Sequence, residues 1–250
     1  GVGFRYPGAE DPVLCGIGFE SHPGEVTAIV GSTGCGKSTL VHLIPRFYDV
    51  TEGSVEIGGT DIRELALDDL RARIGFVPQR AFLFRGSVAD NVRDGRPGAT
   101  DEEVRHALRI AQALPFIEEM EGGLDAPIEQ GGTNVSGGQR QRLAIARAIV
   151  RRPEVYVFDD CFSALDFRTE SALREALRDE TRDATVIIVA QRISTVLHAD
   201  RIIVLDEGSV AGIGTHRELL DTCEVYREIV SSQFSKDELG QPVLPGEVTA

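Results

Sequence analysis

The stretch Gly31–Ser38 reads GSTGCGKS in one-letter code and decides the fold of this chain. It matches the phosphate-loop pattern GxxxxGKS/T, follows the apolar run Val26–Val30 and opens a helical pattern. Glycines let the backbone N–H groups of such a loop converge on phosphate oxygens, and the helix N-terminus adds positive potential. We therefore expect Lys37 to reach the β- and γ-phosphates of a nucleotide and Ser38 to ligate Mg²⁺. The alternative interpretation, an ordinary Gly-rich turn between a strand and a helix, is given very little weight because all eight positions match the pattern. The predicted nucleotide-binding residues of this segment are Gly31, Ser32, Thr33, Gly34, Cys35, Gly36, Lys37, Ser38 and Thr39.

Outside this loop, short runs rich in valine and isoleucine alternate with longer helical patterns. Such runs are typical of parallel strands that are buried on both faces. We therefore expect an α/β fold with a parallel-sheet core of the phosphate-loop NTPase kind. The predicted strands are Val26–Val30, Val155–Phe158, Val186–Val189 and Ile202–Leu205.

Two helical patterns bear on the organisation of the chain. The first follows the phosphate loop, and Pro45 should kink or end it near its last turn. The second runs from Asp101 to Met120, inside the region 82–130, which we expect to be an inserted helical subdomain. The first pattern places four apolar residues on one helix face: Leu40, Leu43, Ile44 and Phe47.

Composition and charge exclude several classes of protein. The chain has 26 Lys and Arg against 40 Asp and Glu, a net charge of −14, so we expect no nucleic-acid partner. Its four cysteines are scattered without a CxxC pair, which argues against a disulfide framework or a zinc site and favours a reducing compartment. No apolar run approaches the ~20 residues that cross a bilayer.

Two further segments carry possible site residues. Val155–Asp159 is an apolar strand that ends in a carboxylate, and after a phosphate loop such an Asp supports the Mg²⁺ shell. Ser136 is a good N-cap for the helix that follows it. Gly137 and Gly138 leave the start of that helix bare, so a phosphate could dock there. An ordinary capped helix explains this second segment equally well.

Taken together, these elements resemble the nucleotide-binding domain of ABC transporters over nearly the whole chain, from Gly3 to about Ser232. The segment Val135–Gln139, VSGGQ, is similar to the family signature, and Ser163–Asp166, SALD, to its D-loop. Gln79 matches the Q-loop glutamine between the two subdomains. Tyr6 matches the aromatic residue that stacks on adenine, although a strand-end aromatic packed on a Pro turn is the alternative.

The resemblance implies a small antiparallel β subdomain beside the parallel sheet, and an inserted α-helical subdomain. Residues 1–235 would form the domain, with the helical subdomain and the signature helix within about 82–150. Residues 236–250 would be a flexible tail. The segments Arg46–Asp49 and 76–91 resemble the exporter subtype, which implies a transmembrane domain upstream in the same polypeptide. The domain would then lie at the cytoplasmic face of a membrane.

In this family two such domains form a head-to-tail dimer, and each ATP lies between the phosphate loop of one domain and the signature of the other. The resemblance therefore assigns one ATP–Mg²⁺ to the phosphate loop of this chain. Its metal-binding residues would be Ser38, Gln79 and Asp159, and its catalytic residues Asp160, Gln191 and Gln79. The signature residues Ser136, Gly137, Gly138 and Gln139 would serve the nucleotide of the partner domain.

Three departures from the family pattern matter. Asp160 stands where the family has a Glu that polarises the attacking water, and its side chain is shorter by roughly 1.5 Å. Gln191 stands where the family has a switch histidine, and an amide cannot exchange a proton near neutral pH. The segment 129–132, EQGG, replaces a Glu-Arg pair flanked by glycines before the signature.

We therefore expect a chain that completes a working site on a different partner while its own site hydrolyses ATP slowly. Because a misplacement of about 1 Å can cost ~10²-fold in rate, Asp160 should be a poor base. A homodimeric exporter with slow Asp-based catalysis, a soluble ABC ATPase outside transport and a purely regulatory ATP-binding module are the alternatives. A guanine-binding Asn-Lys-x-Asp motif is absent, which argues against a small GTPase.

Overall fold

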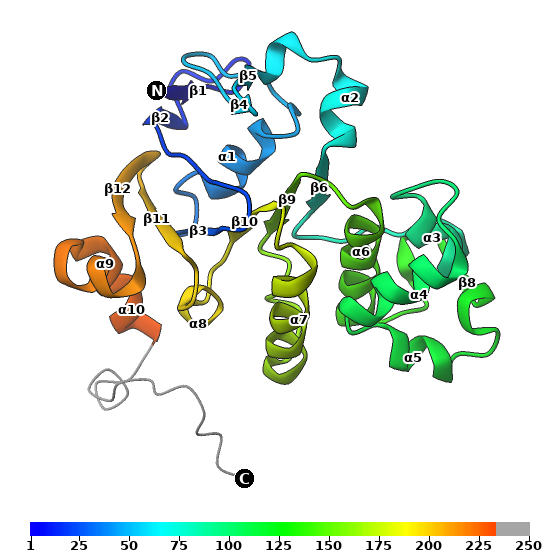
Figure 1. Cartoon of the computed structure of the whole chain (residues 1–250). Coiled ribbons are helices and arrows are strands. Elements are labelled where there is room, and N and C mark those ends of the chain that lie inside the picture. The colour runs from blue at the N-terminus through cyan, green and yellow to red at the C-terminus, as the bar shows by residue number, and fades with distance from the viewer. Residues whose placement is uncertain (234–250) are drawn as a thin grey trace.

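A computed structural model of the chain describes residues 1–233, and a six-stranded sheet lies at its centre (Figure 1). The strand order is β12-β11-β3-β10-β9-β6, and every neighbouring pair is parallel except β11 and β12. All four predicted strands are present, which confirms the parallel-sheet core. The strands are β3 (Val26–Gly31), β6 (Ile74–Val77), β9 (Val155–Asp159), β10 (Thr185–Val189), β11 (Arg201–Asp206) and β12 (Ser209–Gly214).

Each face of this sheet is covered by its own layer, because successive side chains of a strand point to opposite sides. In β3, Ile29 joins one buried cluster, whereas Ala28 and Val30 join the other. The Ile29 cluster contains α1 (Lys37–Leu43), α2 (Leu67–Ala72) and three short strands. The three short strands are β1 (Val2–Phe4), β2 (Leu14–Ile17) and β4 (Glu56–Ile57).

Two small antiparallel sheets form part of that first layer, as the resemblance predicted. β1 pairs with β2, and β4 pairs with β5 (Thr60–Asp61), which leads into a short 3₁₀ turn at Ile62–Glu64. A bridge between Gly3 and Glu52 joins the two regions. In Figure 1 they lie above the main sheet, beside α1.

The other layer consists of helices. In Figure 1, α3 (Val88–Arg93), α4 (Asp101–Ile110) and α5 (Leu114–Glu119) lie on the far side of α6 (Gly137–Arg151) from the sheet. Strand β7 (Gly86–Ser87) pairs with β8 (Pro127–Ile128), so the two ends of this helical region meet. The remaining elements are 3₁₀ turns at Gly123–Asp125 and Gln130–Gly132, α7 (Phe167–Glu180), α8 (Ile193–Val196), α9 (His216–Thr222) and α10 (Glu224–Gln233).

Two helix predictions need correction. Helix α1 ends at Leu43, one residue before its C-cap at Ile44, so the predicted helical face does not extend to Phe47. The prediction that Pro45 ends this helix is confirmed: Ile44 still has a helical backbone, but Pro45 has no N–H to continue the hydrogen-bond ladder and its ring crowds the carbonyl four residues earlier. Phe47 is 46% exposed and packs edge-on against Phe76 instead.

The second correction concerns the stretch from Asp101 to Met120. It forms two helices, because Gln112 between α4 and α5 adopts a left-handed backbone with φ 56°. No helix within residues 1–233 is long and apolar enough to cross a bilayer. The predicted tail at 236–250 lies outside the described residues.

Candidate nucleotide site

The phosphate loop lies between the end of β3 and the start of α1, and two of its positions admit only glycine. Gly36 is the residue before α1 and has φ 101°; a Cβ there would lie 2.7 Å from Leu14 Cδ2. Gly31 has φ 155°, and its Cβ would lie 2.2 Å from the Leu205 carbonyl oxygen. The loop therefore needs glycine both for its backbone conformation and for its close approach to neighbouring strands.

The Lys37 ammonium group lies over this loop. It donates to the carbonyl oxygens of Gly31 at 2.8 Å and Ser32 at 2.7 Å, and its side chain is almost buried. Cys35 is buried below, with its Sγ 3.7 Å from the same nitrogen. The charge is thus held at the loop, where phosphate oxygens would be bound.

Ser38 and Asp159 meet at the end of the sheet. The Ser38 hydroxyl donates to Asp159 Oδ1 at 3.0 Å, although the two residues are far apart in sequence. A hydroxyl and a carboxylate are oxygen ligands of the kind Mg²⁺ prefers, with phosphates and waters completing the shell. Ser38 and Asp159 therefore fit a Mg²⁺ bound together with a nucleotide.

His42 also belongs to this corner, and the sequence reasoning missed it. Its Nε2 lies 3.4 Å from Asp159 Oδ2, and its ring packs against both Phe47 and Phe76. The available signal was spacing, because His42 follows Ser38 by four residues and shares its helix face.

Asp160 lies next to this pair and has two amide partners. Gln79 Nε2 donates to Asp160 Oδ2 at 2.9 Å, and Gln191 Nε2 donates to the same oxygen at 2.6 Å. The structure thus brings together the three residues that the resemblance placed in the catalytic set. They come from the loops that follow three adjacent strands, β6, β9 and β10.

The environment of Asp160 disfavours its charge. The residue is 6% exposed, and this burial is the main cause that raises the pKa of its carboxyl above the usual value of 3.8. The hydrogen bond from the Gln79 side-chain amide lowers this pKa, whereas the neighbouring charge of Asp159 raises it further. Asp160 also has a left-handed backbone, φ 46°, which Asp tolerates better than most residues.

The predicted signature segment begins helix α6, away from the phosphate loop. Ser136 and Gln139 form a capping box, in which the Ser136 hydroxyl accepts from the Gln139 amide at 3.2 Å. Ser136 and Gly137 are exposed, and Gly138 lies beside them. Within residues 1–233, no hydrogen bond joins Ser136–Gln139 to the phosphate loop.

Helix α6 nevertheless contacts the Q-loop, the segment that carries Gln79. Gln141 is buried and donates to the Pro78 carbonyl oxygen at 3.1 Å, one residue before Gln79. The sequence reasoning did not include Gln141. The available signal in the sequence was a polar residue on a helix face that is otherwise apolar.

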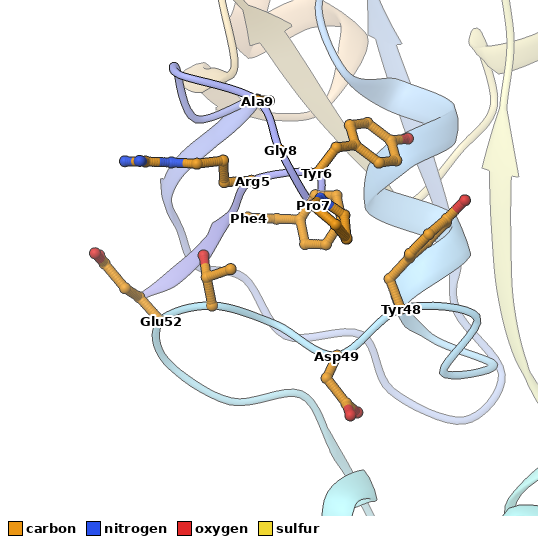
Figure 2. A pocket seen from close by; sticks show the side chains of 10 residues that line it. Phe4, Arg5, Tyr6, Pro7, Gly8, Ala9, Tyr48, Asp49 and Glu52 are labelled. Atoms are coloured by element: carbon orange, nitrogen blue, oxygen red, sulfur yellow. The ribbon is translucent and has the colours of Figure 1, made fainter.

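Tyr6 borders an open cavity of about 610 Å³ at the turn after β1 (Figure 2). Its hydroxyl is 3.0 Å from Thr39 Oγ1 on α1, which ties it to the phosphate-loop helix. Its ring lies edge-on to Phe4 and Tyr48, with centroids 4.9 and 5.3 Å away. Tyr48 also lines this cavity and was not among the predicted residues.

The parallel sheet carries a phosphate loop after β3, a carboxylate at the end of β9, and polar side chains in the loops after β6 and β10. This combination defines a nucleotide-binding domain of the phosphate-loop class. Comparison with known proteins supports a narrower assignment. Residues 14–163 match the family model described as "ABC transporter". The chain therefore belongs to the ABC transporter family, as an ATPase domain.

Similar proteins are longer than this chain. An uncharacterized ABC transporter ATP-binding protein of Mycobacterium tuberculosis is 53% identical over 243 residues, which are 96% of this chain and 41% of that protein. A putative multidrug export ATP-binding/permease protein of Staphylococcus aureus is 44% identical over 93% of this chain and 40% of its own length. A bacterial Atm1-family ABC exporter solved with ATP bound superposes with a TM-score of 0.89 at 40% identity. The superposed part is 93% of this chain and 41% of the exporter chain.

Proposed function

We propose that this domain couples ATP binding and hydrolysis to export across a membrane. The similarity to an export ATP-binding/permease protein and to an Atm1-family exporter supports this proposal. Since the chain spans about 40% of these two proteins, a transmembrane domain would supply the transport path, and this domain would lie at the cytoplasmic membrane face.

The nucleotide would be ATP with Mg²⁺, bound at the phosphate loop. Lys37 would contact the β- and γ-phosphates, while Ser38, Asp159 and Gln79 would hold the Mg²⁺. The contact between Ser38 and Asp159 supports this assignment. Tyr6 would stack on adenine, because its hydroxyl contact to Thr39 holds its ring next to the phosphate-loop helix.

The domain would work in a head-to-tail pair with a second nucleotide-binding domain. Each nucleotide would lie between the phosphate loop of one domain and the signature of the other. The separation of the two motifs within one chain favours such an arrangement. Ser136, Gly137, Gly138 and Gln139 would then complete the site of the partner.

The site of this chain would hydrolyse ATP slowly, and one observation carries that proposal. A single oxygen of Asp160 accepts both the Gln79 and the Gln191 amide, at 2.9 and 2.6 Å. To take a proton from an attacking water, this oxygen must first release a donor. Gln191 has no titratable group to assist, and the Asp160 side chain is about 1.5 Å shorter than Glu. The slow site would be paired with a faster site on a different partner chain.

Single-turnover hydrolysis in the complete reconstituted transporter tests this proposal. We expect two phases, a fast one from the partner's site and a slow one from this chain. Asp160→Asn should remove the slow phase and leave the fast one. Asp160→Glu with Gln191→His should accelerate the slow phase. Lys37→Ala should remove the slow phase through loss of ATP binding, which serves as the control. A single phase that Asp160→Asn abolishes would instead indicate a symmetric pair with Asp-based catalysis.

A further inference from the structure

The backbone on either side of Arg192 is held by one side chain from the C-terminal helix. Gln233 is the last residue of α10. Its Nε2 donates to the Gln191 carbonyl oxygen at 2.7 Å, and its Oε1 accepts from the Ile193 amide at 2.8 Å. One amide group thus brackets the loop that carries Gln191.

This loop has few other backbone partners. Strand β10 ends at Val189, and the Ala190 amide still donates to the Ile29 carbonyl oxygen. Ile193 is the first residue of α8, so its amide has no partner within that helix. Among the described residues, the Gln191 carbonyl and the Ile193 amide are bonded to Gln233 alone.

Helix α10 is a firm support for such a contact. Tyr226 and Val230 on the same helix are almost fully buried against the sheet layer. The Tyr226 hydroxyl lies 2.7 Å from His216 Nδ1, which ties α10 to α9. The position of Gln233 is therefore set by the packed core, although its own side chain is exposed.

The other side of the loop is held from the opposite direction. Arg192 Nη2 donates to the Ser163 carbonyl oxygen at 3.3 Å, and Arg192 Nη1 lies 3.6 Å from the buried Glu170 carboxylate. These contacts fix a side chain, whereas Gln233 fixes the backbone. Only the backbone contact determines where the Gln191 side chain begins.

We propose that Gln233 is a positioning residue that aims Gln191 at Asp160. The path is short: Gln233 holds the Gln191 carbonyl, and the Gln191 side chain donates to Asp160 at 2.6 Å. This inference rests on the proposed role of Gln191 and Asp160 in a slow site. It assigns helix α10 a direct contact with the loop that carries Gln191, called the switch loop below.

Hydrogen exchange in the complete transporter tests the contact itself. Gln233→Met keeps the length of the side chain and removes both hydrogen bonds, and we expect exchange in peptides covering 190–196 to rise about fivefold to tenfold. Gln233→Glu retains an acceptor for the Ile193 amide and should restore most of the protection. Ser232→Ala is the matched control and should change nothing, because the Ser232 hydroxyl donates to the Ile229 carbonyl oxygen within α10. Unchanged exchange in Gln233→Met overturns the inference.

The slow hydrolysis phase tests the functional consequence. Gln233→Met should speed this phase about threefold, because a Gln191 amide that is no longer aimed at Asp160 leaves the carboxylate oxygen free to accept a proton, while the ATP concentration for half saturation stays unchanged. Gln233→Glu should return the rate part of the way to that of the parent chain. If Gln191→Ala speeds the phase and Gln233→Met does not, Gln233 does not position Gln191 and the inference is wrong. If Gln191→Ala itself has no effect, the proposed role of Gln191 fails, and the exchange result alone decides whether Gln233 holds the loop.

Discussion

At the scale of single residues, Asp160 is held in place at a cost in the stability of the folded domain. Its carboxylate is almost fully buried, lies beside Asp159 and accepts two amides on one oxygen. Its backbone is in the left-handed region, where residues other than glycine are strained by about 1–3 kcal/mol. Burial removes water from this carboxylate and disfavours its charged form, so its charge should lower the free energy of unfolding at neutral pH.

The substitution Asp160→Asn should therefore stabilise the domain at pH 7. Burial raises the pKa of Asp160, so the folded state binds the proton more tightly than the unfolded state. Stability then falls as pH rises from about 3.8 through the raised pKa. The advantage of Asn should vanish toward pH 3.8 and grow as pH rises through the raised pKa, so that at pH 7 the Tm of Asp160→Asn exceeds that of the parent chain. Thermal unfolding of both proteins across this pH range measures the effect, and a gain that grows on acidification would contradict it.

At the scale of elements, helices α7 and α8 meet at another buried carboxylate. Glu170 in the first turn of α7 accepts from the Thr195 hydroxyl of α8 at 2.7 Å. Arg174 and Arg192 lie 3.8 and 3.6 Å from its oxygens. Glu170 is 2% exposed, and its carboxylate is the buried member of this cluster, whereas Arg192 reaches solvent.

We expect Glu170→Ala to lower the free energy of unfolding by about 1–3 kcal/mol, because the buried Thr195 hydroxyl loses its acceptor. Glu170→Gln can still accept from Thr195 and should cost less. The control is Glu175→Ala on the exposed face of the same helix, which should stay within about 0.5 kcal/mol of the parent chain. Urea unfolding compares the three variants, and equal losses at 170 and 175 would show that the buried cluster contributes nothing.

At the scale of the whole molecule, the proposed head-to-tail pair predicts unequal effects of two substitutions on this chain. Gly137→Asp introduces a negative charge into the signature, which in this proposal would serve the partner's faster site. The domain should fold normally, because nothing lies within 4 Å of a Cβ at Gly137 and Asp is favoured in the first turn of a helix. Asp160→Asn changes only the slower site.

Steady-state ATPase activity of the complete transporter should fall by at least about 10²-fold in Gly137→Asp, as expected when phosphate-stabilising donors are disturbed. It should fall only modestly in Asp160→Asn, because the slower site contributes little to total turnover. Gly137→Asn, which adds bulk without charge, separates the two causes. Equal loss of activity in Gly137→Asp and Asp160→Asn would mean that the two sites are equivalent.

Much of the architecture could be predicted from the sequence, because the determinants are local. Val26–Val30 and the three similar runs have the composition of buried strands, and the glycine pattern of 31–38 matches a backbone conformation that other residues cannot adopt. The helix boundaries were less predictable. Pro45 predicted the end of α1, but the left-handed break at Gln112 does not follow from apolar periodicity, because periodicity reports which face is buried and not where the backbone turns.

The sequence by itself determined the phosphate loop and the parallel sheet, and its resemblance to the family predicted that Gln79, Asp160 and Gln191 belong to one site. Only the tertiary structure decided that both amides meet on one oxygen of Asp160, that His42 contacts Asp159 and that Gln233 brackets the switch loop. The partners Gln79 and Asp160 are 81 residues apart, and Gln233 and Gln191 are 42 apart. Hydrogen bonds over such separations depend on which strands are neighbours and how the helices pack on them. No local pattern encodes that order, because strand order and helix packing result from the burial of the whole core.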